Sequence, residues 1–486
     1  MKRIFLISLI VNISISGHSQ AVRQITMDEA IALAWENSFD AYSNNYSYEL
    51  SRLNWMDQKY GYRPTISLGS TISDYTRSIQ EQWDSEEQKM LPYEVQWLVN
   101  SASLNLYQPV PFTGGSVSVY SGLRRNQNFA ETGNVLNYVS TPVRFSYSQD
   151  FSKPNSFKWN RKIGELRFLE ANSQRLENRE QVAIRAITAF YDLLIAQNQL
   201  EIASLNASNA DSLMWMAQQK KEIFAITRSD FLNLELQQTN AKIQLEKAQN
   251  DLEMQQVSFN IFLGLEMETT IECITQTVTM PIVIINELAL SKSFENNSDI
   301  LAISRKLQEA ERSVLEARRQ SYSLSISGSL GLNQNKGNIV DAYSDLLDQQ
   351  GVGLTLSVPI YDGGRNARSL QRSKMALEYQ QKEAEQNKIE LSQQITQQVT
   401  NFNITGNQLK AYAKSDTLGA IVYQAVKERF ILGKASIIDM INAEERRQNA
   451  RLSYLQQLKS YWIQYYGIRK LCLYDFEQGL DLMIGY

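Results

Sequence analysis

The stretch that decides the fold runs from Glu165 to Leu263 and includes, from Phe231 to Phe262, the sequence FLNLELQQTNAKIQLEKAQNDLEMQQVSFNIF. Its 99 residues contain no glycine or proline and are rich in Leu, Ala, Gln, Glu and Lys, a composition that favours a very long helix. Residues recur along it at alternating steps of three and four, which is the heptad pattern of packed helices. The positions of this heptad seam are Phe231, Leu234, Gln238, Ala241, Leu245, Ala248, Leu252, Gln255, Phe259 and Phe262.

This stretch is too long for a single helix of a compact domain. A hairpin that turns near Thr227 to Asp230 would have arms of roughly 50 to 90 Å, since each helical residue adds about 1.5 Å. Such a hairpin must pack against other hairpins to cover its apolar seam.

The chain supplies a second copy of the stretch. Adding 209 to a residue number carries Asn198-Gln199-Leu200 onto Asn407-Gln408-Leu409, Asp230 onto Asp439, and Glu235 onto Glu444. The seam maps onto Met440, Ala443, Arg447, Ala450, Tyr454, Gln457, Tyr461, Gln464, Ile468 and Leu471. An internal repeat of this length is strong evidence of architecture, and it predicts two long hairpins.

The openings of the two repeats are related by a different offset. The phrase Glu36-Asn37-Ser38-Phe39-Asp40 returns as Glu295-Asn296-Asn297-Ser298-Asp299, 259 residues later. The first repeat therefore carries roughly fifty extra residues, which we expect between 64 and 160. The predicted divisions are 20–275, with strands at about 64–151 and a hairpin at about 160–265, and 276–486, with strands at about 322–361 and a hairpin at about 365–472.

The first nineteen residues have the features of a secretory signal peptide. Lys2 and Arg3 precede an apolar run from Ile4 to Ile15, and Gly17 and Ser19 suit a cleavage site. After this segment the sequence contains no run of about 18 apolar residues, the length that a membrane-spanning helix needs. We therefore expect a protein that is exported and has no helical membrane anchor.

The composition argues against most catalytic chemistry. The only histidine, His18, lies in the predicted leader, so the mature chain would lack His-dependent catalysis and His metal ligands. Cys273 and Cys472 form no C-x-x-C motif and are expected to be packing residues, with a disulfide as the alternative. There is no phosphate loop, and the net charge of −4 becomes −6 without Lys2 and Arg3. We expect no enzyme, no cofactor, no metal and no nucleic-acid partner.

The intervals predicted to form strands alternate between apolar and small or polar residues. Examples are Ile66 and Leu68, Val117 and Val119, and the second-repeat runs 324–332 and 352–360. In an exported protein this pattern is typical of a membrane β-barrel. A periplasmic or extracellular β-domain is the alternative.

Four phrases resemble the TolC-like outer-membrane efflux proteins. Val358-Pro359-Ile360-Tyr361-Asp362-Gly363-Gly364-Arg365 is similar to that family's passage from strand to helix, and Pro111-Phe112-Thr113-Gly114-Gly115 is its partner in the first repeat. The phrases from Ala225 to Asp230 and from Arg429 to Ala443 resemble the family's hairpin tips. The order of all these features along the chain is also that of the family.

The resemblance implies a mainly helical protein with membrane β-structure. Three copies would form an α-barrel of coiled-coil hairpins that crosses the periplasm, joined to a β-barrel in outer-membrane lipid. Solutes would leave through its bore, delivered by an inner-membrane transporter and a periplasmic adaptor. The first repeat carries more strand candidates than the two expected, so we expect residues 101–124 to form an extra hairpin outside the barrel wall.

The resemblance also assigns site residues. The expected strand-to-helix turn comprises Pro359, Gly363 and Gly364. The expected adaptor-docking tips comprise Ala225, Ile226, Thr227, Phe430, Gly433, Ala435 and Ser436. The expected periplasmic gate comprises Asp230, Asp439, Arg228 and Asn442.

Two other function classes are weighed against the export duct. A secreted coiled-coil stalk or adhesin would share the heptads but not the repeated order of strands and hairpins. An enzyme that uses Asp230 and Asp439 as paired carboxylates is disfavoured, because the two residues are equivalent positions of two repeats on long helices. Each would then be a solvated residue or a helix start.

Overall fold

The computed structural model describes residues 23–85, 88–130, 133–222, 226–275, 281–432 and 434–482. The predicted leader, residues 1–19, lies outside them. The chain divides into two compact units. One, here called the hairpin unit, comprises Met1–Ser47, Ser173–Asn297 and Leu391–Tyr486, and the other, the sheet unit, comprises Tyr48–Asn172 and Ser298–Glu390. Each unit thus takes segments from both sequence repeats.

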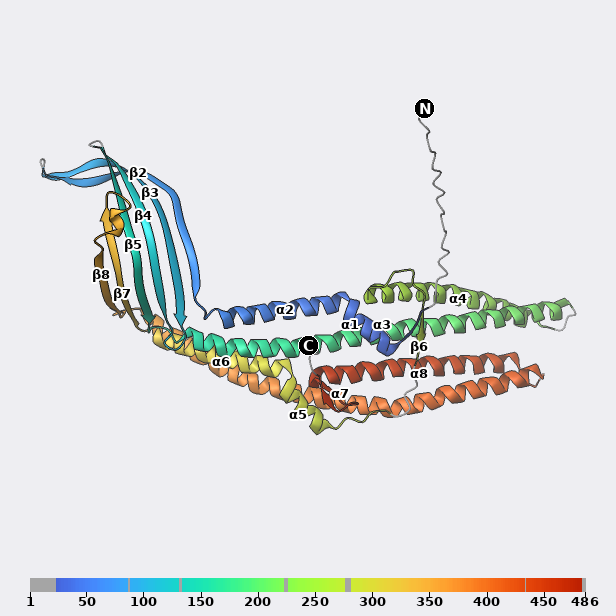
Figure 1. The fold of residues 1–486 in the computed structure, drawn as a ribbon. Helices are drawn as coiled ribbons and strands as arrows, with labels where there is room; N and C mark the ends of the chain where they lie inside the picture. Colours follow the sequence, from blue (N-terminus) through green and yellow to red (C-terminus); the bar gives the residue numbers. More distant parts are fainter. Residues whose placement is uncertain are drawn as a thin grey trace, which may run out of the picture. The chain divides into compact units, whose positions relative to one another are not determined.

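The helices of the two repeats have identical lengths (Figure 1). The two short pairs, of 11 and 22 residues, are α1 (Met27–Asn37) with α5 (Asn286–Asn296) and α2 (Phe39–Tyr60) with α6 (Ser298–Arg319). The two long pairs, of 67 and 36 residues, are α3 (Ser156–Glu222) with α7 (Arg365–Ile431) and α4 (Arg228–Leu263) with α8 (Ile437–Cys472). The short pairs are offset by 259 residues and the long pairs by 209, as the duplication predicts.

Local sequence sets the ends of these helices. Thr26 and Glu29 form a capping box at the start of α1. In the first hairpin, which α3 and α4 form, Gly264 terminates α4 in the left-handed conformation, with φ of +67°. No helix in the described part of the chain combines the length and the apolar character needed to span a membrane.

The heptad seams lie inside the hairpin unit. Every seam position of α8 is buried or half-buried, and in α4 only Gln255 is exposed. Polar contacts join α3 to α8, and the two helices run antiparallel. Asn209 Nδ2 donates to Glu444 Oε1 over 3.0 Å, and Lys459 Nζ lies 2.6 Å from Asp192 Oδ1. The two hairpins therefore pack through apolar seams flanked by a row of polar contacts.

The aromatic residues at the end of α8 form a packed core. Tyr461 and Tyr465 are buried, and the ring of Tyr461 stacks on Phe402 at a centroid distance of 4.9 Å. The Tyr465 hydroxyl donates to Asp475 Oδ1 over 2.9 Å. Cys273 and Cys472 are both buried and free, which confirms the packing role and shows that the disulfide alternative was wrong.

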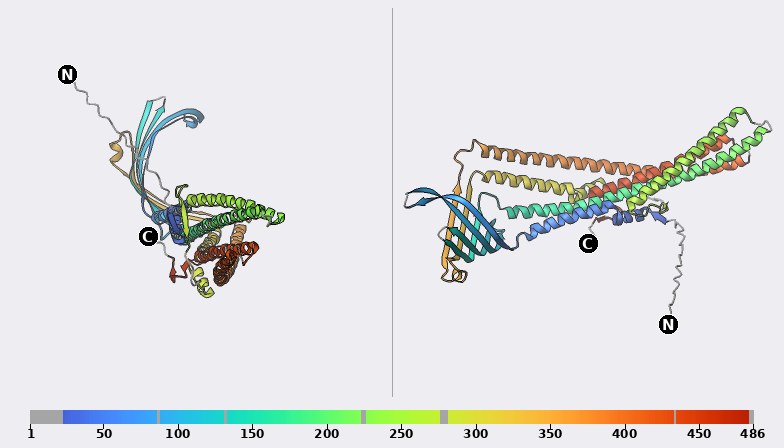
Figure 2. Two further views of the ribbon diagram at one scale, coloured as in Figure 1. Left: turned by 90° about the vertical axis from the view of Figure 1, so that its right-hand side faces the viewer. Right: turned by 90° about the horizontal axis from the view of Figure 1, so that it is seen from above.

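One sheet of six antiparallel strands dominates the sheet unit. Its strands are β2 (Thr65–Asp84), β3 (Lys89–Val110), β4 (Gly115–Ala130), β5 (Gly133–Asp150), β7 (Ser323–Lys336) and β8 (Leu347–Ser357), in that order. Figure 2 shows it as a curved layer. Residues 101–124 belong to β3 and β4 within this sheet, so the prediction of a hairpin outside the wall was wrong. Their alternating apolar pattern pairs in register with the strands on both sides.

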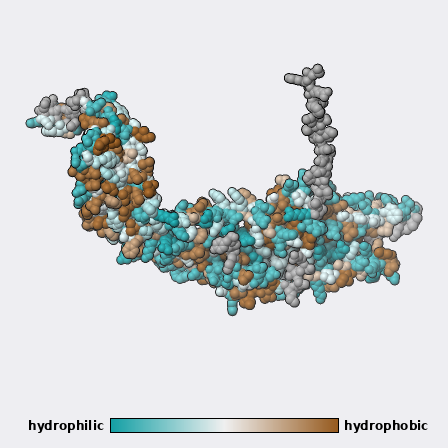
Figure 3. All heavy atoms as spheres, viewed as in Figure 1, coloured by the Kyte–Doolittle hydropathy of each residue, from teal (hydrophilic) through white to brown (hydrophobic). Residues whose placement is uncertain are grey.

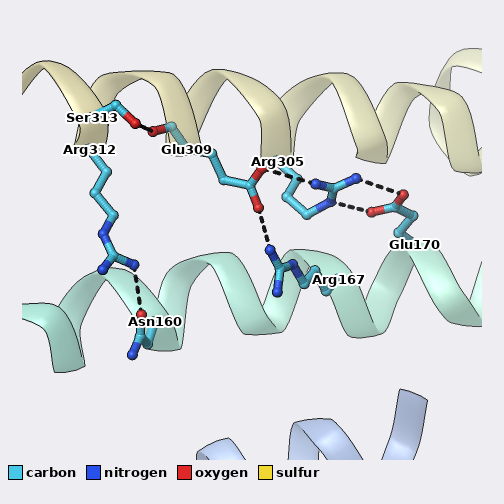
Figure 4. A network of polar contacts seen from close by, with 7 residues as sticks. All are labelled: Asn160, Arg167, Glu170, Arg305, Glu309, Arg312 and Ser313. Atoms are coloured by element: carbon cyan, nitrogen blue, oxygen red, sulfur yellow. Dashed lines mark hydrogen bonds and ion pairs between the residues drawn. The ribbon is translucent and has the colours of Figure 1, made fainter. Parts of the chain in front are cut away.

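Ion pairs join α3 to α6 within the sheet unit (Figure 4). Arg305 of α6 bonds Glu170 of α3 through two nitrogens, at 2.6 and 3.1 Å, and Arg167 of α3 reaches back to Glu309 over 2.7 Å. A bidentate guanidinium–carboxylate pair fixes direction as well as distance. These contacts hold the helix that precedes β7 beside the helix that follows β5.

Two small sheets complete the fold. β1 (Arg23–Thr26) pairs in parallel with β6 (Ile271–Ile274), and β9 (Tyr474–Asp475) pairs with β10 (Leu480–Asp481). The sequence analysis did not predict either sheet, because strands of two to four residues carry too little alternation to be recognised.

Candidate functional site

The two faces of the six-stranded sheet differ in chemistry. Paired residues of antiparallel strands point to the same side, so the register assigns every position to a face. One face carries Ile66, Leu68, Leu104, Leu106, Val117, Val119, Val143, Phe145, Leu324, Ile326, Leu330, Leu332, Val352, Leu354 and Leu356. The other carries the small or polar residues Ser67, Gly69, Ser103, Asn105, Ser118, Ser146, Ser325, Ser327, Ser329, Gly351, Gly353 and Thr355, together with Tyr107, Tyr120 and Arg144.

The apolar face of the sheet has no covering layer of described protein. Leu68, Phe145 and Leu354 are all exposed although they lie in the middle of strands. Figure 3 shows hydrophobic side chains gathered on the sheet. A contiguous apolar surface spread over six strands is far more than a soluble monomer normally exposes.

The predicted strand-to-helix turn has the backbone that its glycines suggest. Gly363 and Gly364 have φ of +61° and +78°, a region that side chains with a Cβ resist. Asp362 caps α7, because its carboxylate accepts from the backbone N–H of Gly364 and of Asn366 at 2.8 and 2.9 Å. These hydrogen bonds hold the pKa of Asp362 below its usual value. Pro359 is exposed just before this turn.

The partner phrase in the first repeat has a different role from the one expected. Pro111 to Gly114 connect β3 to β4 as a hairpin turn, with Gly114 at φ of +87°. The passage into α3 comes after β5 instead. Gly115 lies 41 residues before Ser156, whereas Gly364 directly precedes Arg365, so the β4–β5 hairpin supplies most of the roughly fifty extra residues.

The end of the first hairpin is organised by a helix cap. Thr227 Oγ1 accepts from the Asp230 backbone N–H over 3.1 Å and donates to Asp230 Oδ2 over 2.6 Å. Arg228 is exposed and, among the described residues, forms no ion pair. Ile226 is half-buried, and Ala225 lies outside the described residues.

The end of the second hairpin repeats this cap in a more complete form. Ser436 Oγ accepts from the Asp439 backbone N–H over 3.1 Å, and Asp439 Oδ2 accepts from the backbone N–H and the hydroxyl of Ser436 at 2.9 and 2.7 Å. The hydroxyl bond, the backbone bond and the charge of Arg429 hold the pKa of Asp439 below its usual value. Within the described chain, Arg429 is the cation that acts on Asp439.

The remaining predicted tip residues lie around this second cap. Ala435 and Phe430 are half-buried, Asn442 is exposed, and Gly433 lies outside the described residues. Phe430 lines a groove between the two hairpins, together with Met440, Ile441 and the Asn209–Glu444 pair. The sequence analysis did not count Ile431, Leu432 and Ile438 among the docking residues, although all three are exposed at this end. Their apolar character within the tip phrase was the available signal.

No group of three or more metal-ligating side chains occurs in the part of the chain that the structure describes.

Comparison with known proteins finds similarity to outer-membrane efflux and secretion proteins. Residues 289–472 match the family model described as outer membrane efflux protein. The chain is 24% identical over 341 residues to the proteases secretion protein PrtF of Dickeya chrysanthemi. This alignment covers 68% of this chain and 71% of that protein. It is 21% identical over 301 residues to the outer membrane protein TolC of Vibrio cholerae. This second alignment covers 58% of this chain and 65% of that protein.

A solved structure shares the fold. The crystal structure of the Campylobacter jejuni CmeC outer membrane channel aligns with a TM-score of 0.64 and 13% identity, over 94% of this chain and 87% of that chain. These findings confirm the predicted fold class, with long helical hairpins and a β-sheet built by duplication. They also confirm the predicted resemblance. The matched family consists of transport channels rather than enzymes.

Proposed function

We propose, from the premise that the chain is a TolC-like outer-membrane efflux protein, that it is the exit duct of a multi-component efflux or secretion system. The duct conducts solutes passively to the cell exterior. The observation that carries this proposal is the two-faced sheet, which has mainly branched apolar side chains on one side and mainly small or polar side chains on the other. This is the pattern of a barrel wall between lipid and water.

The hairpins support assembly into a homotrimer. Besides the buried seam, α4 carries a second apolar stripe that remains exposed in the single chain. The residues of this exposed stripe are Leu232, Leu236, Ile243, Met254 and Ile261. Because their spacing of four, seven and eleven residues keeps them on one side of the helix, they form a surface suited to a neighbouring copy.

The hairpin ends are the proposed docking surface for a periplasmic adaptor. The expected tip residues Ile226, Thr227, Phe430, Ala435 and Ser436 surround two helix starts, and Ala225 and Gly433 complete the same phrases. Exposed Ile431, Leu432 and Ile438 add an apolar patch at the second end. An inner-membrane transporter would deliver cargo through the adaptor. A Phe430→Asp variant should lower export at unchanged protein level.

The same ends are the proposed periplasmic gate. In a trimer, three copies each of Asp230 and Asp439 would approach the axis, with Arg228 and Asn442 beside them. Exposed polar contacts contribute only about 0.2 to 1 kcal/mol each. Three symmetric sets would therefore keep the resting duct mostly closed, and a partner that binds the open form more tightly could open it.

Membrane fractionation tests the proposed function. An export duct should remain in the outer-membrane fraction after washing with high salt and alkaline carbonate, and proteoliposomes that contain it should become permeable to small sugars. A secreted stalk or adhesin would be released by the wash and leave liposomes impermeable. Release by the wash would contradict the duct.

A further inference from the structure

We infer that three copies of this chain close one barrel of eighteen strands, six from each copy. The inference rests on the proposed function, because it requires a trimeric duct. The observation behind it is that all six long strands of one chain belong to a single sheet, with β2 and β8 as its two free edges.

The two free edges are built to be paired. Residues 65–73 of β2 contain no charged residue and no proline, the charges of this strand begin at Asp74, and β8 contains only Asp348 as a charge. Soluble proteins protect exposed edges with charges, prolines or bulges because unpaired edges aggregate. Long edges without such protection indicate strands that are covered in the assembled protein, and a second copy of the same sheet offers both complementary edges.

The apolar side chains at the edges lack a lateral neighbour. Leu68 on β2 and Val352 on β8 are 79% and 88% exposed, whereas Leu104 and Phe145 on inner strands of the same face are 48% and 53% exposed. A neighbouring strand would cover the edge residues from the side. The free edges therefore have the exposure expected of strands that have lost one partner.

The direction and face of the two edges also match. β2 follows α2 and β8 leads into α7, so β8 of one copy runs antiparallel to β2 of the next. A register that places Ser67 opposite Thr355 would also place Ile66 opposite Leu356 and Leu68 opposite Leu354. The apolar face and the face of small polar residues would then both continue across the junction.

The number of strands sets the width of the bore. With strands about 4.8 Å apart and tilted by about 40°, eighteen strands enclose a backbone diameter of about 35 Å, against about 24 Å for twelve. The six strands reach eighteen because the β4–β5 hairpin is inserted between the Gly114-Gly115 turn and α3. The second repeat has no such insertion between Gly364 and Arg365.

The side chains on the polar face differ from strand to strand. On β7 and β8 this face carries mainly serine and glycine, such as Ser327 and Gly353. On the inner strands it also carries Tyr107, Tyr120 and Arg144.

Disulfide trapping tests the closure. Ser67→Cys combined with Thr355→Cys, and with Gly353→Cys and Ser357→Cys as neighbouring registers, should give trimers that resist denaturing electrophoresis until reduced. Ser103→Cys with Thr355→Cys is the matched control, because β3 is an inner strand and should give no cross-link. The parent protein, with buried Cys273 and Cys472, sets the background.

Polymer exclusion in planar bilayers tests the width. Polyethylene glycols added on the exterior side should lower the conductance of the parent up to a larger polymer size than in a variant that lacks residues 116–155, in which Gly115 leads directly into Ser156. A conducting trimer with no cross-link in any register, or with the same exclusion limit as the shortened variant, would overturn the eighteen-stranded barrel. If the shortened variant does not assemble, cross-linking alone decides. Failure of the parent to insert or conduct would instead overturn the proposed function.

Discussion

Asp230 and Asp439, which lie 209 residues apart, occupy the same place in the first turn of α4 and of α8, and each bonds the hydroxyl of the residue three positions before it. The duplication has thus preserved a helix cap at both hairpin ends. The carboxylates have a local task in each chain, whatever they do in the assembled duct. A test of the gate must separate this capping task from the charge.

Two variants at the second hairpin end make that separation. Asp439→Asn removes the charge and keeps an oxygen that can accept from Ser436, so block of the pore by divalent cations should weaken. Ser436→Ala keeps the charge and loses the cap, which should destabilise the helix start by about 1 kcal/mol and leave the block unchanged. Single-channel recordings with added divalent cations measure the block. Loss of block in Ser436→Ala but not in Asp439→Asn would mean that the carboxylate acts only as a cap.

The buried Glu444 should make the hairpin unit less stable at high pH. Burial raises the pKa of Glu444 above its usual value. The hydrogen bond from Asn209 and the charge of Arg447 lower this pKa, but by less than burial raises it. A carboxyl group whose folded pKa is raised contributes its full stability below the unfolded pKa, and this stability is lost as the pH rises through the folded pKa. Glu444→Gln should therefore raise the melting temperature at neutral and alkaline pH and change it little at about pH 4.

Glu235 is the matched control for this experiment, because it is the repeat equivalent of Glu444 but is exposed on α4. Glu235→Gln should leave the pH dependence as in the parent protein. The same pH profile in Glu444→Gln and the parent would contradict the role given to burial.

The heptad seam should accept a change of shape but not a charge. Leu245 is half-buried in the seam of α4. Leu245→Met keeps the apolar contact and should cost under about 1.5 kcal/mol. Leu245→Asp places a carboxylate against the neighbouring helix, which should cost several kcal/mol in each copy and reduce the yield of trimer. Size-exclusion chromatography in detergent compares the yields, and equal yields would contradict the seam.

The left-handed backbone before α7 should make Gly363 and Gly364 sensitive to substitution. Gly363→Val and Gly364→Val force a branched side chain to positive φ, at about 1 to 2 kcal/mol each. Gly328→Val is the control, because a Cβ at that strand position meets no atom within 4 Å. The melting temperature and the amount of protein in the outer membrane should fall for Gly363→Val and Gly364→Val only. An equal effect at Gly328 would mean that volume, not φ, decides.

The sequence predicted the features that repeat or alternate over many residues. The offset of 209 residues matched α4 to α8 without a gap because a heptad pattern over ten positions is hard to mistake. The single phrase Pro111 to Gly115 misled, since two glycines after a proline suit a hairpin turn as well as a turn into a helix. Only the register of β4 and β5 distinguishes the two. The capping role of Asp362 depends on local backbone geometry, which a periodic sequence pattern does not predict. The same holds for the exposure of Ile431 and Leu432.

Planar-bilayer recording of the purified, full-length trimer tests the central claim most directly. An exit duct should give discrete, long-lived conductance steps of one size, and their amplitude should rise in the double variant Asp439→Ala with Arg228→Ala. A folded trimer that inserts into the bilayer and gives no steps in either form would contradict the account of this chain as an outer-membrane channel.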